Sequence, residues 1–113
     1  MELDWIKCQN NRWCSFERLK LNNLDYDGVY VIFFESTLNT VVRVGQGNIK
    51  ERISAHRSDS EITKYAKYKL LVTWARVANS DLNGVEAFLG DFWDPLVGDN
   101  YPDVEFIRVN SPF

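Results

Sequence analysis

The stretch that decides the fold is GVYVIFFESTLNTVVRVGQGNIKERISAHR, which runs from Gly28 to Arg57. It begins with an apolar run, Val29 to Phe34, that is too short for a globular helix and is rich in β-branched and aromatic residues. This composition predicts a buried strand. After a polar link, a second β-branched run from Thr40 to Val44 predicts the return strand of a hairpin. We expect that strand to end at a loop containing Gly45 and Gly47.

A short helix is predicted directly after the hairpin. Asn48 is a favoured N-cap residue, and Glu51, three positions later, can bond back to it in a capping box. Ile49 and Ile53 are four residues apart and give the helix one apolar stripe. The hairpin and this helix would together occupy residues 28–58.

Arg52 and His56, the chain's only histidine, are four residues apart, so they lie one helical turn from each other on the same face. The end of the hairpin would bring Tyr30 and Arg43 close to them. Guanidinium groups bind phosphate oxygens in a fork, and a phenol or an imidazole can move a proton. These four side chains therefore predict a site for a phosphate group.

The order of these residues resembles the GIY-YIG nuclease superfamily. In that family the first tripeptide is typically Gly-Ile-Tyr and the second is Tyr-Ile-Gly, whereas here Gly28–Tyr30 reads GVY and Arg43–Gly45 reads RVG. Valine is a mild replacement for each isoleucine. Arg43 is a larger departure, because it stands where the second tyrosine would be. It could bind substrate more tightly, clamp Tyr30 in an unproductive position, or mark a protein that has lost catalysis.

The later part of the chain continues the resemblance. Glu86 is followed by Ala-Phe-Leu and then by Asp94–Leu96, which is similar to the family's glutamate helix and the proline turn after it. The similar region extends from about Gly28 to Asp103.

The resemblance implies a metal-dependent DNA endonuclease or nicking enzyme. Arg52 would bind the scissile phosphate, Tyr30 or His56 would orient and deprotonate a water, and Glu86 would hold one Mg²⁺ or Mn²⁺ ion. The predicted catalytic residues are Tyr30, Arg52, His56 and Glu86. The predicted phosphate contacts are Arg43, Lys50, Arg52 and Arg57. The two nearby arginines could lower the pKa of Tyr30, and His56 has the advantage of a pKa near neutrality.

Each of these residues also has a purely structural interpretation. Glu86 could be the capping-box partner of Asn83, Tyr30 a core strand residue, and His56 a surface residue of its helix. Tyr65 or Tyr68 could supply the phenol missing from the second tripeptide, although no spacing rule supports it.

The alternative function is a catalytically impaired nucleic-acid-binding or regulatory module, because Arg43 replaces the tyrosine and no separate DNA-recognition domain is visible. A third alternative is an interaction domain that uses the four tryptophans. Strong DNA sequence specificity would require a homodimer or a larger complex.

The net charge of −3 argues at first against a nucleic-acid partner, because proteins that bind phosphate backbones usually carry a basic surface. The basic residues are concentrated, however. Arg43 to Arg76 contains eight lysines and arginines against three acids, and the rest of the chain has five against thirteen. This segment also holds the predicted site, which favours DNA as the partner, although a solvated helical face of mixed charge would give the same pattern.

Cys8 and Cys14 are six residues apart, which matches no common zinc spacing. We expect free, largely buried thiols rather than a disulfide, because a reducing compartment disfavours that bond. No stretch approaches the about 20 apolar residues of a membrane span, and the N-terminal residues lack the regions of a signal peptide. The sequence therefore predicts a cytoplasmic protein without a membrane partner.

The rest of the chain predicts alternating helices and strands. A helix is expected within Ser58–Lys67, a strand at Lys69–Val77 and a turn at Asn79–Asn83. A helix would then begin at Asn83 and end before Pro95, with the core stripe Val85, Phe88, Leu89 and Phe92. Gly98–Pro102 would be a loop and Val104–Val109 a last strand. Residues 1–27 are the least readable, with a short strand and a turn of helix expected.

These elements predict a single domain, residues 1–113, with a GIY-YIG-like core at about 28–103. We expect an α+β fold, with a small, mainly antiparallel sheet of three strands, an extra edge strand being the alternative, flanked by helices.

Overall fold

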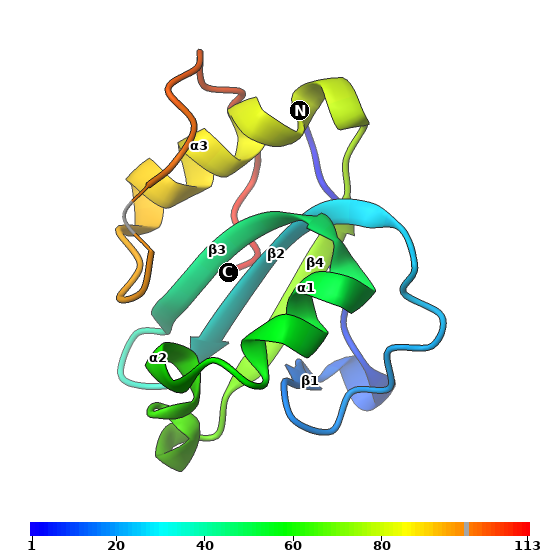
Figure 1. The fold of residues 1–113 in the computed structure, drawn as a ribbon, viewed down its shortest axis with the longest axis vertical. Coiled ribbons are helices and arrows are strands. Elements are labelled where there is room, and N and C mark those ends of the chain that lie inside the picture. Colours follow the sequence, from blue (N-terminus) through cyan, green and yellow to red (C-terminus); the bar gives the residue numbers. More distant parts are fainter. Residues whose placement is uncertain (99) are drawn as a thin grey trace.

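The hairpin expected from residues 28–44 forms the middle and one edge of an antiparallel sheet (Figure 1). The computed structural model describes residues 1–98 and 100–113. The strands lie in the order β1-β4-β2-β3. Their bounds are Cys14–Ser15 for β1, Asp27–Phe34 for β2, Thr40–Asn48 for β3 and Leu71–Arg76 for β4. The α-helices are Ile49–His56 for α1, Ser60–Thr63 for α2 and Leu82–Trp93 for α3. The α+β class is confirmed, but the sheet has four strands rather than three.

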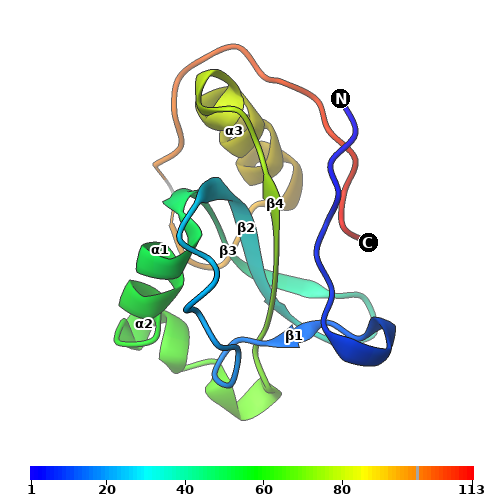
Figure 2. The same cartoon turned by 90° about the vertical axis from the view of Figure 1, so that its right-hand side faces the viewer.

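The two faces of the sheet are covered by different helices (Figure 1). On one face, Ile53 of α1 is fully buried in the same apolar cluster as Tyr30 of β2. On the other face, Val85 of α3 is buried in the same cluster as Val29 of β2. Figure 2 shows α1 and α2 together on one side of the strands, away from α3. Since successive strand residues point to opposite faces, β2 contributes to both clusters.

β3 continues through the glycines that were expected to end it. Gly45 pairs with Tyr30 and Gly47 pairs with Gly28, so the expected loop is part of the ladder. A Cβ atom at Gly45 would lie 2.1 Å from the Tyr30 hydroxyl oxygen, which means that only glycine allows the tyrosine ring to lie against this strand. The backbone of Gly47 has a φ of +123°, a conformation that other residues rarely adopt. These glycines serve close packing and backbone geometry rather than a turn.

The helix predictions are confirmed in part. Asn48 caps α1 as predicted, since its side-chain oxygen accepts a bond of 3.0 Å from the amide of Glu51. The helix predicted within Ser58–Lys67 is shorter, because α2 ends at Thr63 and a separate 3₁₀ turn covers Ala66–Tyr68.

The last helix differs from the prediction in its start and in its buried face. α3 follows a 3₁₀ turn at Asn79–Asp81 and begins at Leu82, so Asn83 lies inside the helix and not at its cap. Phe92, expected in the core stripe, has 58% of its surface exposed. Its neighbour Trp93 packs against the apolar cluster instead, and Phe92 lies edge-on to the Trp93 ring.

The predicted strand at Val104–Val109 is wrong. This segment has no strand pairing, and its Ile107 amide donates 3.0 Å to the carbonyl of Gly84, so the segment lies along α3 instead of the sheet. The predicted loop Gly98–Pro102 includes Asp99, which lies outside the described residues. Just before it, the amide of Val97 donates 2.8 Å to the carbonyl of Val42, which fixes this loop along β3.

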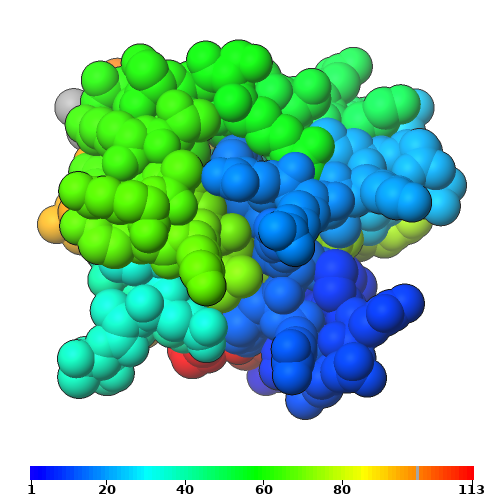
Figure 3. Space-filling view, turned by 90° about the horizontal axis from the view of Figure 1, so that it is seen from below, coloured from blue at the N-terminus to red at the C-terminus, as the bar shows by residue number. Residues whose placement is uncertain are grey.

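The N-terminal residues supply the fourth strand and lie along β4, at one edge of the sheet. They include a 3₁₀ turn at Gln9–Asn11 and the strand β1. Arg57, at the end of α1, donates to the carbonyls of Phe16 and Leu19 at 2.9 and 2.6 Å. Figure 3 shows the N-terminal segment in blue against the green segment that holds α1 and α2.

The two ends of the chain run side by side (Figure 2). The indole of Trp5 donates 3.0 Å to the carbonyl of Asn110, and the Asn110 amide group donates 3.0 Å to the carbonyl of Leu3. None of the helices described is long and apolar enough to cross a bilayer.

Cys8 and Cys14 form a disulfide, which corrects the expectation of free thiols. The bond closes a short loop around the 3₁₀ turn before β1, with the two Cα atoms 5.1 Å apart. Disulfides persist mainly in oxidising compartments, so the reducing compartment from which free thiols were expected does not account for this pairing.

Replacing Cys14 with serine should lower the free energy of unfolding by about 2 kcal/mol, because the unfolded chain regains the freedom that a short closed loop removes. Denaturant unfolding with and without reductant measures this difference. Reductant should destabilise the wild-type protein by the same amount and leave Cys14→Ser unchanged. Titration of two free thiols in protein purified without reductant would contradict the pairing.

Candidate functional site

The polar residues predicted as a site meet at the β3 edge of the sheet. Tyr30 on β2 pairs with Gly45, and Ile32 pairs with Arg43 of β3. Paired residues of antiparallel strands share a face, and Tyr30 and Ile32 are two positions apart, so Arg43 and Tyr30 belong to the same face. That face is the one covered by α1, which carries Arg52 and His56.

Tyr30 and His56 form a buried hydrogen-bonded pair. The Tyr30 hydroxyl oxygen lies 2.6 Å from Nε2 of His56. Tyr30 is fully buried and His56 is 6% exposed, so the alternative of a surface histidine is excluded. The absence of a side chain at Gly45 gives the phenol room at this position.

The protonation states of this pair follow from burial and from the neighbouring arginines. Burial raises the pKa of Tyr30, although the charges and N–H groups of Arg52 and Arg43 act to lower it. Burial, with the charges of Arg43 and Arg52, lowers the pKa of His56 to about 4, and Asp59 opposes this weakly. The two arginines act on the Tyr30 pKa in the predicted direction, but burial outweighs them. The near-neutral pKa predicted for His56 is wrong for the free protein. At neutral pH both groups are uncharged, and in the tautomer that carries the imidazole proton on Nδ1 the Tyr30 hydroxyl donates to Nε2.

Arg52 lies beside the pair on the outer part of α1. Its side-chain carbons pack near Gly47, since a Cβ built on that glycine would meet Arg52 Cγ and Cδ at 3.5 and 3.6 Å. The residue is exposed, and its charge acts on Tyr30, His56 and Glu86. It is available to an anion from solvent.

Arg43 is held more tightly than Arg52. A Cβ atom at Gly98 would lie 1.9 Å from its Nη1, so the loop after α3 packs directly against the guanidinium. Its Nε is buried and has no hydrogen-bond partner among residues 1–98 and 100–113. A buried charged donor without a partner costs free energy, which is recovered if an anion reaches it.

Glu86 comes from the helix on the opposite face of the sheet, yet it faces the same edge. Gln46 of β3 donates 3.0 Å to the side-chain oxygen of Asn83, which fixes the start of α3 over β3. Glu86 is three residues after Asn83 and therefore on a neighbouring part of that helix surface. Burial raises its pKa, and the positive charges of Arg43 and Arg52 oppose that shift. Because α3 begins at Leu82 and Asn83 is not its N-cap, the capping-box role suggested for Glu86 does not occur.

The carboxylate of Glu86 fits a site with a single protein ligand for a divalent ion. Among the described residues the one ion pair joins Lys64 and Glu61, whose charged atoms lie 3.0 Å apart. Glu86 therefore forms no ion pair with a basic side chain in this part of the chain. Residues 1–98 and 100–113 contain no cluster of three or more His, Cys, Asp or Glu. Mg²⁺ usually keeps several waters and binds through one or two carboxylates plus substrate phosphates, so one half-buried carboxylate is enough for it.

The remaining predicted phosphate contacts are less centrally placed. Lys50 is exposed on α1, whereas the Arg57 guanidinium donates to the carbonyls of Phe16 and Leu19. Tyr65 and Tyr68, considered as sources of the missing phenol, stack on Phe34 instead.

Sequence reasoning missed Tyr101. Burial raises the pKa of its phenol, and the charges of Arg43 and Glu86 act on it, which places the phenol in the same group of side chains. No motif or spacing marked this residue, because it lies in an irregular segment that only the folded chain brings to β3.

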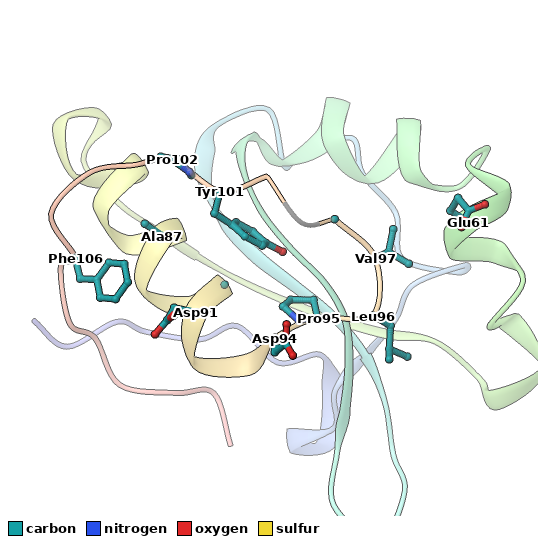
Figure 4. Close-up of a pocket in the computed structure, with 12 residues that line it drawn as sticks. Glu61, Ala87, Asp91, Asp94, Pro95, Leu96, Val97, Tyr101, Pro102 and Phe106 are labelled. Atoms are coloured by element: carbon teal, nitrogen blue, oxygen red, sulfur yellow. The ribbon is translucent and has the colours of Figure 1, made fainter.

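A hollow of about 800 Å³ adjoins the site at Tyr101 (Figure 4). Figure 4 shows the tyrosine ring extending into it from the C-terminal segment, with Asp91 and Asp94 on its rim. Because these carboxylates would repel a phosphate backbone, the hollow itself is a poor place for DNA. The basic side chains lie at the β3 edge.

The pKa of His56 predicts how the protein responds to acid. His56 should titrate near pH 4 in the folded protein, compared with about 6.5 for an ordinary histidine. Between these values the unfolded chain binds more protons, so stability falls as pH is lowered through this window. NMR titration of the imidazole measures the pKa directly. A His56→Gln variant should lose stability less steeply over the same range, and a measured pKa near 6.5 would contradict the buried pair.

No family model matches the chain, and no curated protein or solved structure is significantly similar to it. The membership in the GIY-YIG superfamily therefore stays a prediction from the residues quoted above. What the chain does is inferred from the group of side chains around Tyr30.

Proposed function

We propose that the protein is a metal-dependent DNA endonuclease or nicking enzyme that hydrolyses phosphodiester bonds at the β3 edge. The observation that supports this most is the meeting of a buried Tyr30–His56 pair, two arginines and the Glu86 carboxylate. These groups come from two strands and from helices on opposite faces of the sheet. Phosphodiester hydrolysis needs an anion site, a proton acceptor and a divalent ion, and this group of side chains offers a candidate for each.

The phosphodiester would bind between Arg52 and Arg43. Arg52 is exposed and can form a forked pair with phosphate oxygens, and Arg43 has a buried Nε without a partner among the described residues. A bound anion would also offset the positive charges that lower the pKa of His56. Substrate binding would therefore make His56 a better proton acceptor than it is in the free protein.

Tyr30 would orient the attacking water and pass its proton on. As the water oxygen bonds to phosphorus, one of its protons moves to the Tyr30 oxygen while the phenol proton moves to Nε2 of His56, 2.6 Å away. The bond to the leaving oxygen then breaks, and that oxygen takes a proton from solvent. This relay needs no phenolate, which agrees with the raised pKa of Tyr30.

Glu86 would hold one Mg²⁺ or Mn²⁺ ion, whose charge offsets the negative charge that develops on the phosphate and the leaving oxygen. The half-buried carboxylate is close enough to Arg43 and Arg52 to feel their charges. Glu86, as the residue that would hold the ion, and the two arginines would thus act at one phosphate group.

The alternative is a non-catalytic nucleic-acid-binding module on the same scaffold. The observation that favours it is Arg43, which occupies the place of the second tyrosine and keeps the pKa of His56 low. Such a module would bind DNA in a salt-sensitive way that needs the arginines but neither metal nor Glu86.

Supercoiled plasmid with Mg²⁺ or Mn²⁺ tests the enzyme directly. We expect the wild-type protein to nick it, and expect Tyr30→Phe and Glu86→Gln each to be slower by about 10²-fold or more, because each loses one chemical group and keeps its shape. Glu35→Gln is a matched control, since Glu35 is exposed in the β2–β3 loop and should leave the rate unchanged.

Equal background nicking by all four proteins would rule out the enzyme. Filter binding of the same DNA at low and high salt then separates the alternative. Salt-sensitive binding that survives Glu86→Gln and is lost in Arg52→Ala would support the non-catalytic module.

A further inference from the structure

Tyr101 has a buried hydroxyl group without a hydrogen-bond partner among residues 1–98 and 100–113. Leaving a buried hydroxyl unpaired costs free energy that phenylalanine would avoid at the same position. The ring alone would be enough to attach the C-terminal segment to α3. The hydroxyl therefore needs a separate explanation.

One side of the Tyr101 ring is fixed by α3. A Cβ atom at Gly90 would lie 2.7–2.8 Å from three atoms of this ring, so the tyrosine packs directly on the helix backbone. Gly90 is four residues after Glu86, and such residues lie one above the other on a helix. The Tyr101 ring is thus one turn away from the proposed metal ligand.

The hydroxyl end of Tyr101 is placed by β3 and its neighbouring loop. The amide of Val44 acts on the Tyr101 oxygen, but no hydrogen bond of ordinary geometry forms. Val44 lies between Arg43, which carries the guanidinium, and Gly45, which leaves room for the Tyr30 ring. The loop residue Gly98 packs on the Arg43 guanidinium just before Tyr101.

We propose that Tyr101 is a catalytic residue of this site, and that its hydroxyl donates a hydrogen bond to an oxygen of the substrate phosphodiester. The proposal rests on the proposed nuclease function. Its basis is the unpaired hydroxyl that Gly90 and β3 hold between Glu86 and Arg43. Together with the orphan Nε of Arg43, it gives the site two buried donors without partners in the described part of the chain. Two such donors would gain hydrogen bonds if an anion reached them.

A chain with this geometry does not need a tyrosine at position 43 to present a second phenol. Tyr30 approaches the site from β2, and Tyr101 approaches it from the segment after α3. Burial raises the pKa of Tyr101, so its phenol keeps the proton that it would donate.

Single-turnover nicking by Tyr101→Phe tests the proposal, with Tyr68→Phe as the control. Tyr68 is 47% exposed and stacks on Phe34 away from the site. We expect Tyr101→Phe to be slower by about tenfold or more, the usual effect of losing a hydrogen bond to a charged group. Tyr68→Phe should stay within about twofold of the wild-type rate. The melting temperature of Tyr101→Phe should be unchanged or higher, because an unpaired buried hydroxyl is removed.

A wild-type nicking rate in Tyr101→Phe would overturn the proposal and leave the nuclease function intact. A lower melting temperature in that variant would also contradict it, since the hydroxyl would then have a structural partner. If the wild-type protein does not nick DNA, the nuclease function fails. The role of Tyr101 is then tested by measuring the affinity of the wild-type protein and of Tyr101→Phe for a short DNA duplex without metal. An affinity about tenfold weaker in Tyr101→Phe supports the contact with phosphate, and equal affinity overturns it.

Discussion

The close approach of the Tyr30 ring to the backbone of Gly45 is the constraint on which the site depends. Any side chain at position 45 would collide with the phenol, because even a Cβ atom would lie 2.1 Å from its oxygen. With that space free, the hydroxyl reaches His56 on α1 while the ring stays in the core. The strand pairing, the position of α1 and the polar pair are therefore linked through one glycine.

The site contains more positive than negative charge. Arg43 and Arg52 lie near one carboxylate, Glu86, and both arginines lower the pKa of His56. Buried donors without partners in the described residues add to this imbalance. An arrangement of this kind is less stable than a fully paired one, and a bound anion would relieve it. This excess of positive charge and of unpaired donors favours an anion as the ligand, independently of any resemblance.

Local patterns in the sequence predicted the central hairpin, the capped helix α1 and the strand before α3, because each has a clear hydrophobic period or capping residue. Residues whose position depends on tertiary contacts were predicted less well. Gly45 and Gly47 were interpreted as a turn although they serve close packing, and Asn83 bonds to Gln46 instead of capping α3. Tyr101 could not be found at all, since its place is set by Gly90 of α3 and by β3.

The central claim is that Glu86, from one face of the sheet, and the Tyr30–His56 pair, from the other, share one cation and phosphate site. Paramagnetic broadening by Mn²⁺ tests this most directly, because it reports distance to the ion whether or not the protein cleaves DNA. We predict that Mn²⁺ broadens the imidazole signals of His56 in the wild-type protein and that Glu86→Gln abolishes this broadening. Mg²⁺, which is diamagnetic, should broaden the signals in neither protein. Unaffected His56 signals, or equal broadening in Glu86→Gln, would contradict the account.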